Sequence, residues 1–328
     1  MGSILSGSTQ SLASKAHPVR GYLYIAGATF LWGVAASLGR AAFTGRLFAS
    51  GQVLKIDPVI LSQSRTTFSF LVLLPLLLAR RGWQRLKVPA ADFGRIVLLG
   101  VLGVAASNYC YYLAIQKTNV ATAIILQYTA PVLVLLYTVA RGLQRATVQR
   151  VSAVGLAVLG STLAIGIVGA GGLRLNPEGV AAAMLAAVSF AFYNLEGHKI
   201  LARYDRWIVL LYTTLSAGVF WLFVNPPWKL VAAHYSGGEW GFLLVFAVVS
   251  VLGPFSFYFA GLQHLEPTRA IVASCLEPVF SIVIAAIVLG EVLRPVQTLG
   301  IVVVLAAIVL VQWPERTGQA ATVVEPIE

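Results

Sequence analysis

Charged side chains are scarce in this sequence. Only 11% of its 328 residues are Asp, Glu, Lys or Arg, whereas 58% are hydrophobic. A water-soluble domain of this length needs far more polar side chains to cover its surface. The composition therefore excludes a soluble globule and indicates an integral membrane protein.

Cysteine and histidine are also rare, with two and four copies. Cys110 and Cys275 both lie in long apolar stretches and cannot build a disulfide framework. The histidines are scattered along the chain, so no spacing typical of a metal site appears. We therefore expect no metal or other cofactor. The clustered catalytic groups that a membrane enzyme needs are missing, and we expect no enzymatic activity.

Long apolar stretches follow one another with short polar interruptions. About 20 residues at ~1.5 Å each cross the hydrocarbon core of a bilayer. The short alternating segments of a membrane β-barrel are missing. The sequence predicts an all-α polytopic membrane protein with ten transmembrane helices, between tails at 1–20 and 314–328. The ten predicted spans are 21–41, 57–79, 93–113, 118–140, 147–168, 177–197, 206–225, 240–263, 267–289 and 295–313.

The net charge of +11 is unevenly placed along this predicted topology. If the N-terminus is cytoplasmic, most of the 23 Lys and Arg residues fall in cytoplasmic loops. The positive-inside rule then predicts that both termini are cytoplasmic in a multi-pass protein of the inner (plasma) membrane. Anionic lipid of the bilayer is a sufficient partner for this charge, and no nucleic-acid partner is needed.

An internal repeat relates the two halves of the chain. Residues 64–131 come into register with the second half when the sequence is shifted by 147 positions. Because each half holds five predicted helices, an odd number, the halves enter the membrane from opposite sides. We expect inverted five-helix repeats at 21–168 and 169–313. Matched pairs include Thr66 and Thr213, Tyr111 and Tyr258, Gln116 and Gln263, and Pro131 and Pro278.

Several stretches also resemble a known family. Residues 262–300 read LQHLEPTRAIVASCLEPVFSIVIAAIVLGEVLRPVQTLG, and this segment resembles the second-half signature of the drug/metabolite transporter superfamily, in its EamA-type ten-helix members. The pattern rests on the LEPV motif at Leu276 to Val279, the LGE motif from Leu289, and Gly300. In the first half, residues 64–75 and 111–133 resemble the corresponding family stretches.

This resemblance implies a secondary transporter that exports small organic metabolites, often amino acids, from a central cavity lined by both halves. Inverted repeats suit such a role because they can exchange conformations about a midplane site, which gives alternating access. A membrane channel or facilitator for small solutes is the alternative, although neither a TVGYG-like filter nor a ring of acids is present. The solute, the coupling ion and the oligomeric state stay open.

Polar and aromatic residues within the predicted spans are the candidates for substrate contact. A buried amide or hydroxyl needs a partner or a wet cavity. Tyrosines near helix ends also fit an interfacial belt, and buried amides fit structural bonds between helices. An aromatic stripe more often reflects packing between helices than a ligand surface. The candidates are Trp32, Arg65, Asn108, Tyr111, Gln127, Tyr193, Asn194, Tyr258, Ser274 and Glu277.

Glu277 and Arg65 are the charges placed deepest in the predicted spans. Glu277 lies ten residues after Pro267, or ~15 Å along the helix, near the bilayer midplane. An isolated charge at that depth costs about 2.5–3.5 kcal/mol on insertion scales, which favours pairing or hydration. We hypothesise that Arg65 and Glu277 approach each other, either to join the halves or to bind a zwitterionic substrate. Each could instead contact backbone carbonyls or water, Arg65 could reach the interface, and Glu277 could take up a proton during turnover.

Overall fold

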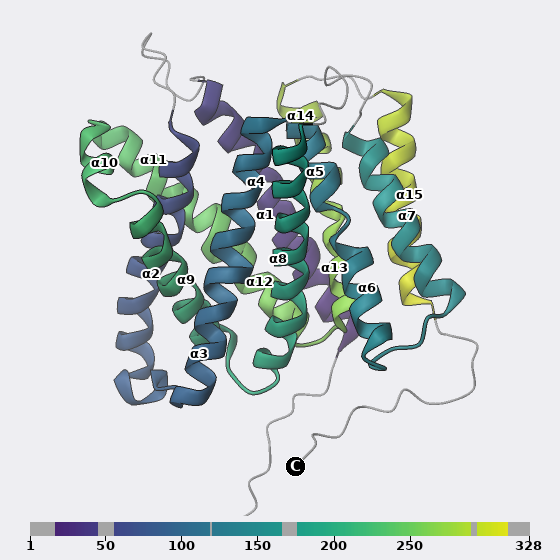
Figure 1. Ribbon diagram of the computed structural model, residues 1–328, viewed down its shortest axis with the longest axis horizontal. Coiled ribbons are helices and arrows are strands. Elements are labelled where there is room, and N and C mark those ends of the chain that lie inside the picture. The colour runs from purple at the N-terminus through teal and green to yellow at the C-terminus, as the bar shows by residue number, and fades with distance from the viewer. Residues whose placement is uncertain (1–16, 45–55, 119, 166–175, 290–293, 314–328) are drawn as a thin grey trace, which may run out of the picture.

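The computed structural model describes residues 17–44, 56–118, 120–165, 176–289 and 294–313. Within these ranges the chain is helical throughout, without strands. Figure 1 shows the helices side by side in one bundle. The first half contains α1 (Pro18–Thr44), α2 (Pro58–Arg81), the 3-10 turn η1 (Trp83–Leu86), α3 (Ala90–Leu98), the π-helical segment η2 (Leu99–Ala105), α4 (Ala106–Lys117), α5 (Val120–Gln127), α6 (Ala130–Ala140) and α7 (Val148–Ile165). The second contains α8 (Pro177–Leu201), α9 (Arg206–Val224), α10 (Pro227–Ala232), α11 (Gly237–Ala247), the π-helical segment η4 (Val248–Leu252), α12 (Gly253–Leu262), α13 (Pro267–Ser274), α14 (Leu276–Leu289) and α15 (Pro295–Gln312).

The all-α membrane fold predicted from the sequence is confirmed. Each predicted span coincides with one helix or with consecutive helices, with ends that differ by a few residues. Among the described residues, nine helical segments are long and apolar enough to cross a membrane. The 27-residue α1 runs through the bundle beside them, and the count of ten stays a prediction. The predicted tail at 314–328, and the tail at 1–20 as far as residue 16, lie outside the described residues.

Four of the predicted spans are interrupted, which the sequence pattern did not indicate. The segments η2 and η4 interrupt the third and eighth spans, and short turns divide the fourth and ninth spans. The interruptions recur at the offset of the sequence repeat. Gln127 ends α5 and Ser274 ends α13, and these residues are 147 positions apart. The repeat is therefore one of backbone conformation as well as of residue type.

Helix starts follow from local sequence. Proline stands in the first turn of α2, α8, α10, α13 and α15, where its missing N–H is no loss. Side chains cap several of these starts: Asp57 accepts from two backbone N–H groups of α2, and Asn176 caps α8. Ser236 and Glu239 form a capping box at α11. These signals set where each span begins, and so which residues reach its midpoint.

The two halves pack against each other through equivalent elements. The first helix of each half lies on the third span of the other half, so that α1 contacts α12 and α8 contacts α4. The second spans also pair, as α2 with α9, and the fifth spans pair as α7 with α15. Such exchanged packing is expected of inverted repeats. Whether the halves divide at residue 168 stays a prediction.

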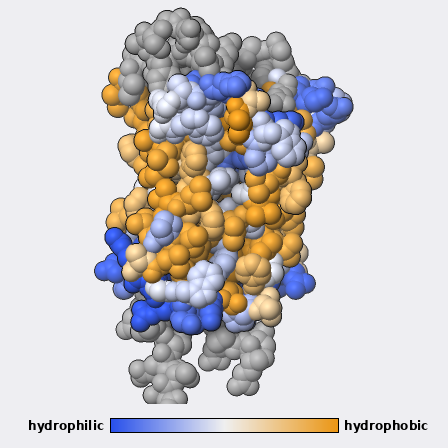
Figure 2. Space-filling model, turned by 90° about the vertical axis from the view of Figure 1, so that its left-hand side faces the viewer, coloured by the Kyte–Doolittle hydropathy of each residue, from blue (hydrophilic) through white to orange (hydrophobic). Residues whose placement is uncertain are grey.

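The surface agrees with a membrane environment. Figure 2 shows an apolar belt between two more hydrophilic ends of the molecule. Large apolar side chains are exposed around the bundle, including Leu71 (54%), Leu185 (57%) and Val302 (57%). In water such a belt would be costly, whereas lipid tails solvate it.

Candidate functional site: a cavity between the halves

A cavity of about 760 Å³ lies between the two halves of the bundle. Its walls come from the later part of α1, the first turns of α2 and the later part of α4. Those parts lie toward the end of the bundle opposite the start of α1 and the end of α15 in Figure 1. The cavity therefore extends from the middle of the molecule toward that end. Its polar and aromatic lining consists of Trp32, Arg65, Ser107, Asn108, Tyr111, Tyr112, Gln127, Tyr128, Phe190, Tyr193, Phe246, Phe255, Ser274, Glu277 and Ser281.

The structure brings eight of the ten candidate residues to this cavity. Asn194 and Tyr258 do not line it and lie fully buried behind its floor. Tyr258 donates its hydroxyl to Asn194 Oδ1 at 2.5 Å, and Asn194 Nδ2 donates to the carbonyl of Phe190 at 2.8 Å. For these two residues, one bond between α12 and α8 and one bond within α8 account for the buried polar groups. The candidates that reach the cavity are Trp32, Arg65, Asn108, Tyr111, Gln127, Tyr193, Ser274 and Glu277.

The break between α13 and α14 places Glu277 at the cavity wall. Glu277 lies in the first turn of α14, where the helix dipole favours a negative charge. Tyr128 lies at the equivalent break between α5 and α6, and its hydroxyl donates to Glu277 Oε2 at 3.1 Å. The two broken helices thus meet at one carboxylate. Broken helices at mid-membrane are a common way to build a solute site.

Arg65 reaches the cavity from α2 and binds an amide rather than an acid. Its Nη2 donates to Asn108 Oδ1 at 2.5 Å, and Asn108 Nδ2 donates to the carbonyl of Val104 at 2.8 Å. The second bond fixes the amide so that its oxygen is directed at the guanidinium. Arg65 and Glu277 form no ion pair with each other in the described structure. The two side chains thus line one cavity without a direct ion pair in this conformation, and each has a neutral partner. That they approach each other during transport stays a prediction.

The remaining polar groups make weak or local bonds. Gln127 Nε2 lies 3.5 Å from Ser107 Oγ, which is long for a hydrogen bond. Ser274 Oγ donates to the carbonyl of Ile271 within its own helix at 2.7 Å. Gln127 thus lines the cavity and also contacts a neighbouring helix, so substrate contact and interhelical bonding both fit it.

Aromatic rings close the floor of the cavity. Tyr193 stacks on Phe190 with ring centroids 6.2 Å apart, and Trp32 lies edge-on to Phe255 at 5.4 Å. Tyr193 is 1% exposed although it lines the cavity. The contacts support the packing interpretation of the aromatic stripe, and the rings also form an apolar surface for a ligand.

Beyond this floor, ion pairs join the two halves at the end of the bundle where α1 begins and α15 ends. Arg95 Nε donates to Glu196 at 2.9 Å, and Arg81 donates to Asp205 at 2.8 Å. Arg150 Nη2 lies 3.5 Å from Glu266. We call these three contacts the closing pairs. Together with the aromatic floor they separate the cavity from that end of the protein.

Seven of the polar and aromatic lining residues were not among the candidates: Ser107, Tyr112, Tyr128, Phe190, Phe246, Phe255 and Ser281. Tyr112 could have been selected, because it is four residues after Asn108 and shares its helix face. Ser107, Phe246 and Phe255 carried no such signal. Phe246 and Phe255 lie on either side of η4, and the π-helical turn changes which helix face they present.

This arrangement suits the binding of a small amphipathic solute. One acid, one base and a few hydroxyl and amide groups project from largely apolar walls, which is the usual make-up of a ligand pocket. No three His, Cys, Asp or Glu side chains in the described part of the chain gather to hold a metal ion. The fold and the cavity define a helical membrane protein with a solute site at the contact of two repeats.

Comparisons with known proteins agree with this class. Residues 19–166 and 177–313 both match the EamA-like transporter family, so the chain belongs to that family. It is 22% identical over 271 residues to the uncharacterized inner membrane transporter YicL of Salmonella typhimurium, covering 78% of this chain and 89% of the relative. It is 29% identical over 210 residues to the threonine/homoserine exporter RhtA of Escherichia coli K12, covering 63% and 67%. A solved crystal structure matches with a TM-score of 0.73 at 18% identity, covering 90% of this chain and 97% of the other, which shows the shared fold.

The protein is therefore a multi-pass membrane transporter and not an enzyme. It acts on a small-molecule substrate within a lipid bilayer. The resemblance recognised in the sequence to the drug/metabolite transporter superfamily is confirmed.

Proposed function

We propose that this protein exports small zwitterionic amino acids across the inner membrane by alternating access. The observation that carries the proposal is that Arg65 and Glu277 line one cavity without forming an ion pair with each other. An amino acid presents a carboxylate and an ammonium group to complement these charges. Charge-assisted hydrogen bonds of this kind are roughly twice as strong as neutral ones.

The relatives support the substrate class. One of them is named a threonine/homoserine exporter, and both compounds are small zwitterions with a hydroxyl group. The hydroxyl and amide groups of Tyr111, Gln127 and Ser274 offer partners for such a side chain. We therefore take L-threonine as the first compound to test.

Alternating access is favoured over a channel by the closure of one end. A channel needs a continuous wet path, whereas the floor of Tyr193, Phe190 and Phe255 and the closing pairs lie across that path. The repeated helix breaks give both halves the same means to rearrange. The topology with both termini in the cytoplasm would make the open end face the outside.

Counterflow in proteoliposomes tests this function directly. Vesicles loaded with unlabelled L-threonine should accumulate external labelled L-threonine transiently, which a channel does not produce. Glu277→Gln and Arg65→Gln should each weaken half-saturation about ten- to hundredfold, because each removes a hydrogen bond to a charge worth about 1.5–3 kcal/mol.

Arg80→Gln is the matched control, since Arg80 lies exposed on the same helix as Arg65 and outside the cavity. It should transport like the wild type. Wild-type counterflow by Glu277→Gln would reject the assigned role of the acid, and absence of counterflow for L-threonine in the wild type would reject the substrate class.

A further inference from the structure

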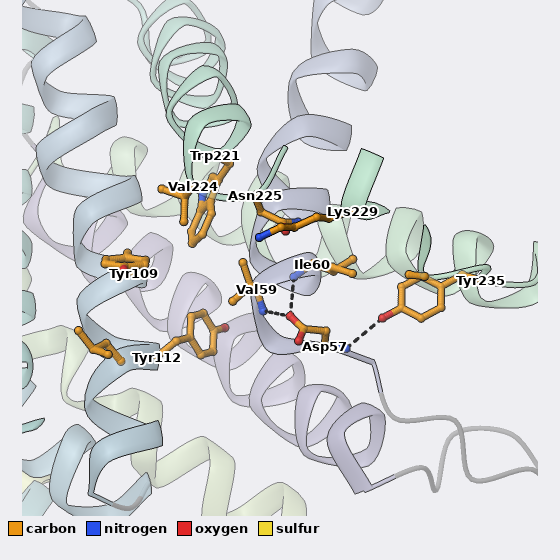
Figure 3. A pocket seen from close by; sticks show the side chains of 12 residues that line it. Asp57, Val59, Ile60, Tyr109, Tyr112, Trp221, Val224, Asn225, Lys229 and Tyr235 are labelled. Atoms are coloured by element: carbon orange, nitrogen blue, oxygen red, sulfur yellow. Dashed lines mark hydrogen bonds between the residues drawn. The ribbon is translucent and has the colours of Figure 1, made fainter. Parts of the chain in front are cut away.

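A second cavity, of about 660 Å³, lies near the open end, where α2, α4, α9 and α10 meet. Figure 3 shows its side chains converging from these elements. It holds one acid, one base and several aromatic rings: Asp57, Tyr109, Tyr112, Trp221, Lys229 and Tyr235. This is the same combination of groups that lines the central cavity.

The carboxylate of Asp57 is held in place by hydrogen bonds to only one of its two oxygens. Its Oδ1 accepts from the backbone N–H groups of Val59 at 2.7 Å and Ile60 at 3.2 Å (Figure 3). Its Oδ2 takes part in no hydrogen bond or ion pair among the residues that the structure describes. An ammonium group in the cavity can therefore bind an acid that is already positioned.

Lys229 supplies the opposite charge on the same cavity. It forms no ion pair within the described ranges, so its ammonium is available to an anion. Tyr109 and Trp221 form an apolar wall, with ring centroids 6.3 Å apart. A small molecule with both charges and a compact side chain fits these three surfaces.

The walls are held by hydrogen bonds before any ligand binds. The backbone N–H of Asp57 donates to the Tyr235 hydroxyl at 3.0 Å. Burial raises the pKa of Tyr235, so the hydroxyl keeps its proton and can itself donate to a ligand. Gln63 and Asn225 exchange two hydrogen bonds, of 2.9 and 2.6 Å, that tie the end of α9 to α2. A preorganised site loses less entropy on binding.

Tyr112 lines both cavities, so a single side chain lies where they adjoin. We propose that the second cavity is an exit subsite, which holds the zwitterion with its ammonium on Asp57 and its carboxylate on Lys229 after it leaves the central cavity. The inference rests on the proposed export of amino acids and adds a second binding position to it.

The symmetry-related end of the molecule carries similar charges in a different state. Asp57 caps α2, and Asp205 caps the equivalent helix α9. There Arg81 binds Asp205 directly at 2.8 Å, so those two charges neutralise each other. Asp57 and Lys229 form no such pair in the part of the chain that the structure describes, which leaves both charges to a ligand.

Equilibrium binding of radiolabelled L-threonine to the full-length protein in phosphatidylcholine nanodiscs tests the inference. The wild type should bind two molecules per chain. Lys229→Gln and Asp57→Asn should each bind one, Arg65→Gln should retain one, and the Arg65→Gln/Lys229→Gln double variant should bind none. Asn caps a helix as well as Asp does, so Asp57→Asn removes the charge and leaves the start of α2 intact.

Lys117→Gln is the control, because it makes the same charge change at the same end outside both cavities. It should bind two molecules. A wild type with one site, lost in Arg65→Gln and unchanged in Lys229→Gln, would overturn the exit subsite while leaving the proposed function intact. A phospholipid that co-purifies with the wild type, is lost in Lys229→Gln and excludes L-threonine would also overturn it. Absence of any L-threonine binding would overturn both.

Discussion

At the scale of single residues, Asn108 determines whether Arg65 is available to a substrate. Its amide oxygen accepts from the guanidinium, but a neutral amide does not cancel the charge. Asn108→Asp is almost isosteric and would convert this hydrogen bond into an ion pair. We predict at least a tenfold loss of apparent L-threonine affinity in counterflow, because the carboxylate of the substrate must then compete with an internal acid.

An Asn-to-Asp substitution outside the cavity tests whether an added negative charge by itself weakens transport. Asn176 caps α8 outside the cavity, and Asp serves that position equally well. Asn176→Asp should therefore transport like the wild type. Unchanged affinity in Asn108→Asp, with normal expression, would mean that Arg65 does not receive the substrate carboxylate.

At the scale of helices, the contact between α7 and α15 depends on glycine. A Cβ atom on Gly300 would lie 2.7 Å from the Gly160 carbonyl oxygen and closer still to the Ala164 backbone nitrogen. Since backbone cannot yield as a flexible side chain does, we predict that Gly300→Ala loses about 1–3 kcal/mol of stability through overpacking. The midpoint of thermal unfolding in detergent, followed by size-exclusion chromatography, measures this loss.

Gly155→Ala on α7 is the matched control. A Cβ atom there meets nothing within 4 Å, and alanine favours a helix more than glycine does. Its midpoint should be unchanged or slightly higher. Equal midpoints for Gly300→Ala and the wild type would show that the two helices separate at little cost.

The helices also show where prediction from sequence succeeded and where it stopped. Hydropathy located the spans because lipid exposure imposes an apolar composition on every helix. It did not reveal the breaks after Gln127 and Ser274, since a broken helix in protein surroundings has the same composition as a continuous one. Pro131 and Pro278 are a matched pair of the repeat, and the structure places them in the first turns of α6 and α14. From the sequence alone, however, each proline is equally compatible with an unbroken span.

The candidate residues fall into two groups, those that line the cavity and those that bond to each other behind it, for a similar reason. Depth along a span was enough to find Arg65 and Glu277, because charge within a span is rare. Asn194 and Tyr258 have the same depth signal, yet they satisfy each other behind the cavity floor. Whether a buried polar group faces a cavity or a partner depends on how the halves pack, and this packing is not encoded in the pattern of one helix.

At the scale of the whole molecule, the closing pairs hold one end shut. Arg81 and Asp205, Arg95 and Glu196, and Arg150 and Glu266 each join one half to the other. For alternating access these contacts must break when the cavity opens toward the end where α1 begins. Partly exposed ion pairs of this kind contribute about 0.2–1 kcal/mol each, which is small enough to break during turnover and, for three pairs together, large enough to bias the resting state.

Removing two of these pairs should shift the protein away from the present conformation. In a background with Cys110 and Cys275 replaced by Ala, Ser281→Cys places one thiol in the cavity. Arg95→Gln with Arg150→Gln removes about 0.4–2 kcal/mol, which lowers the ratio of the present to the opposite conformation about two- to thirtyfold. We therefore predict a slower reaction with a membrane-impermeant thiol reagent applied at the open end. Lys117→Gln is the control, because its pair with Glu178 lies at the open end, and its loss should leave the labelling rate equal or faster. Undiminished labelling in the double variant would mean that the aromatic floor alone sets the resting state.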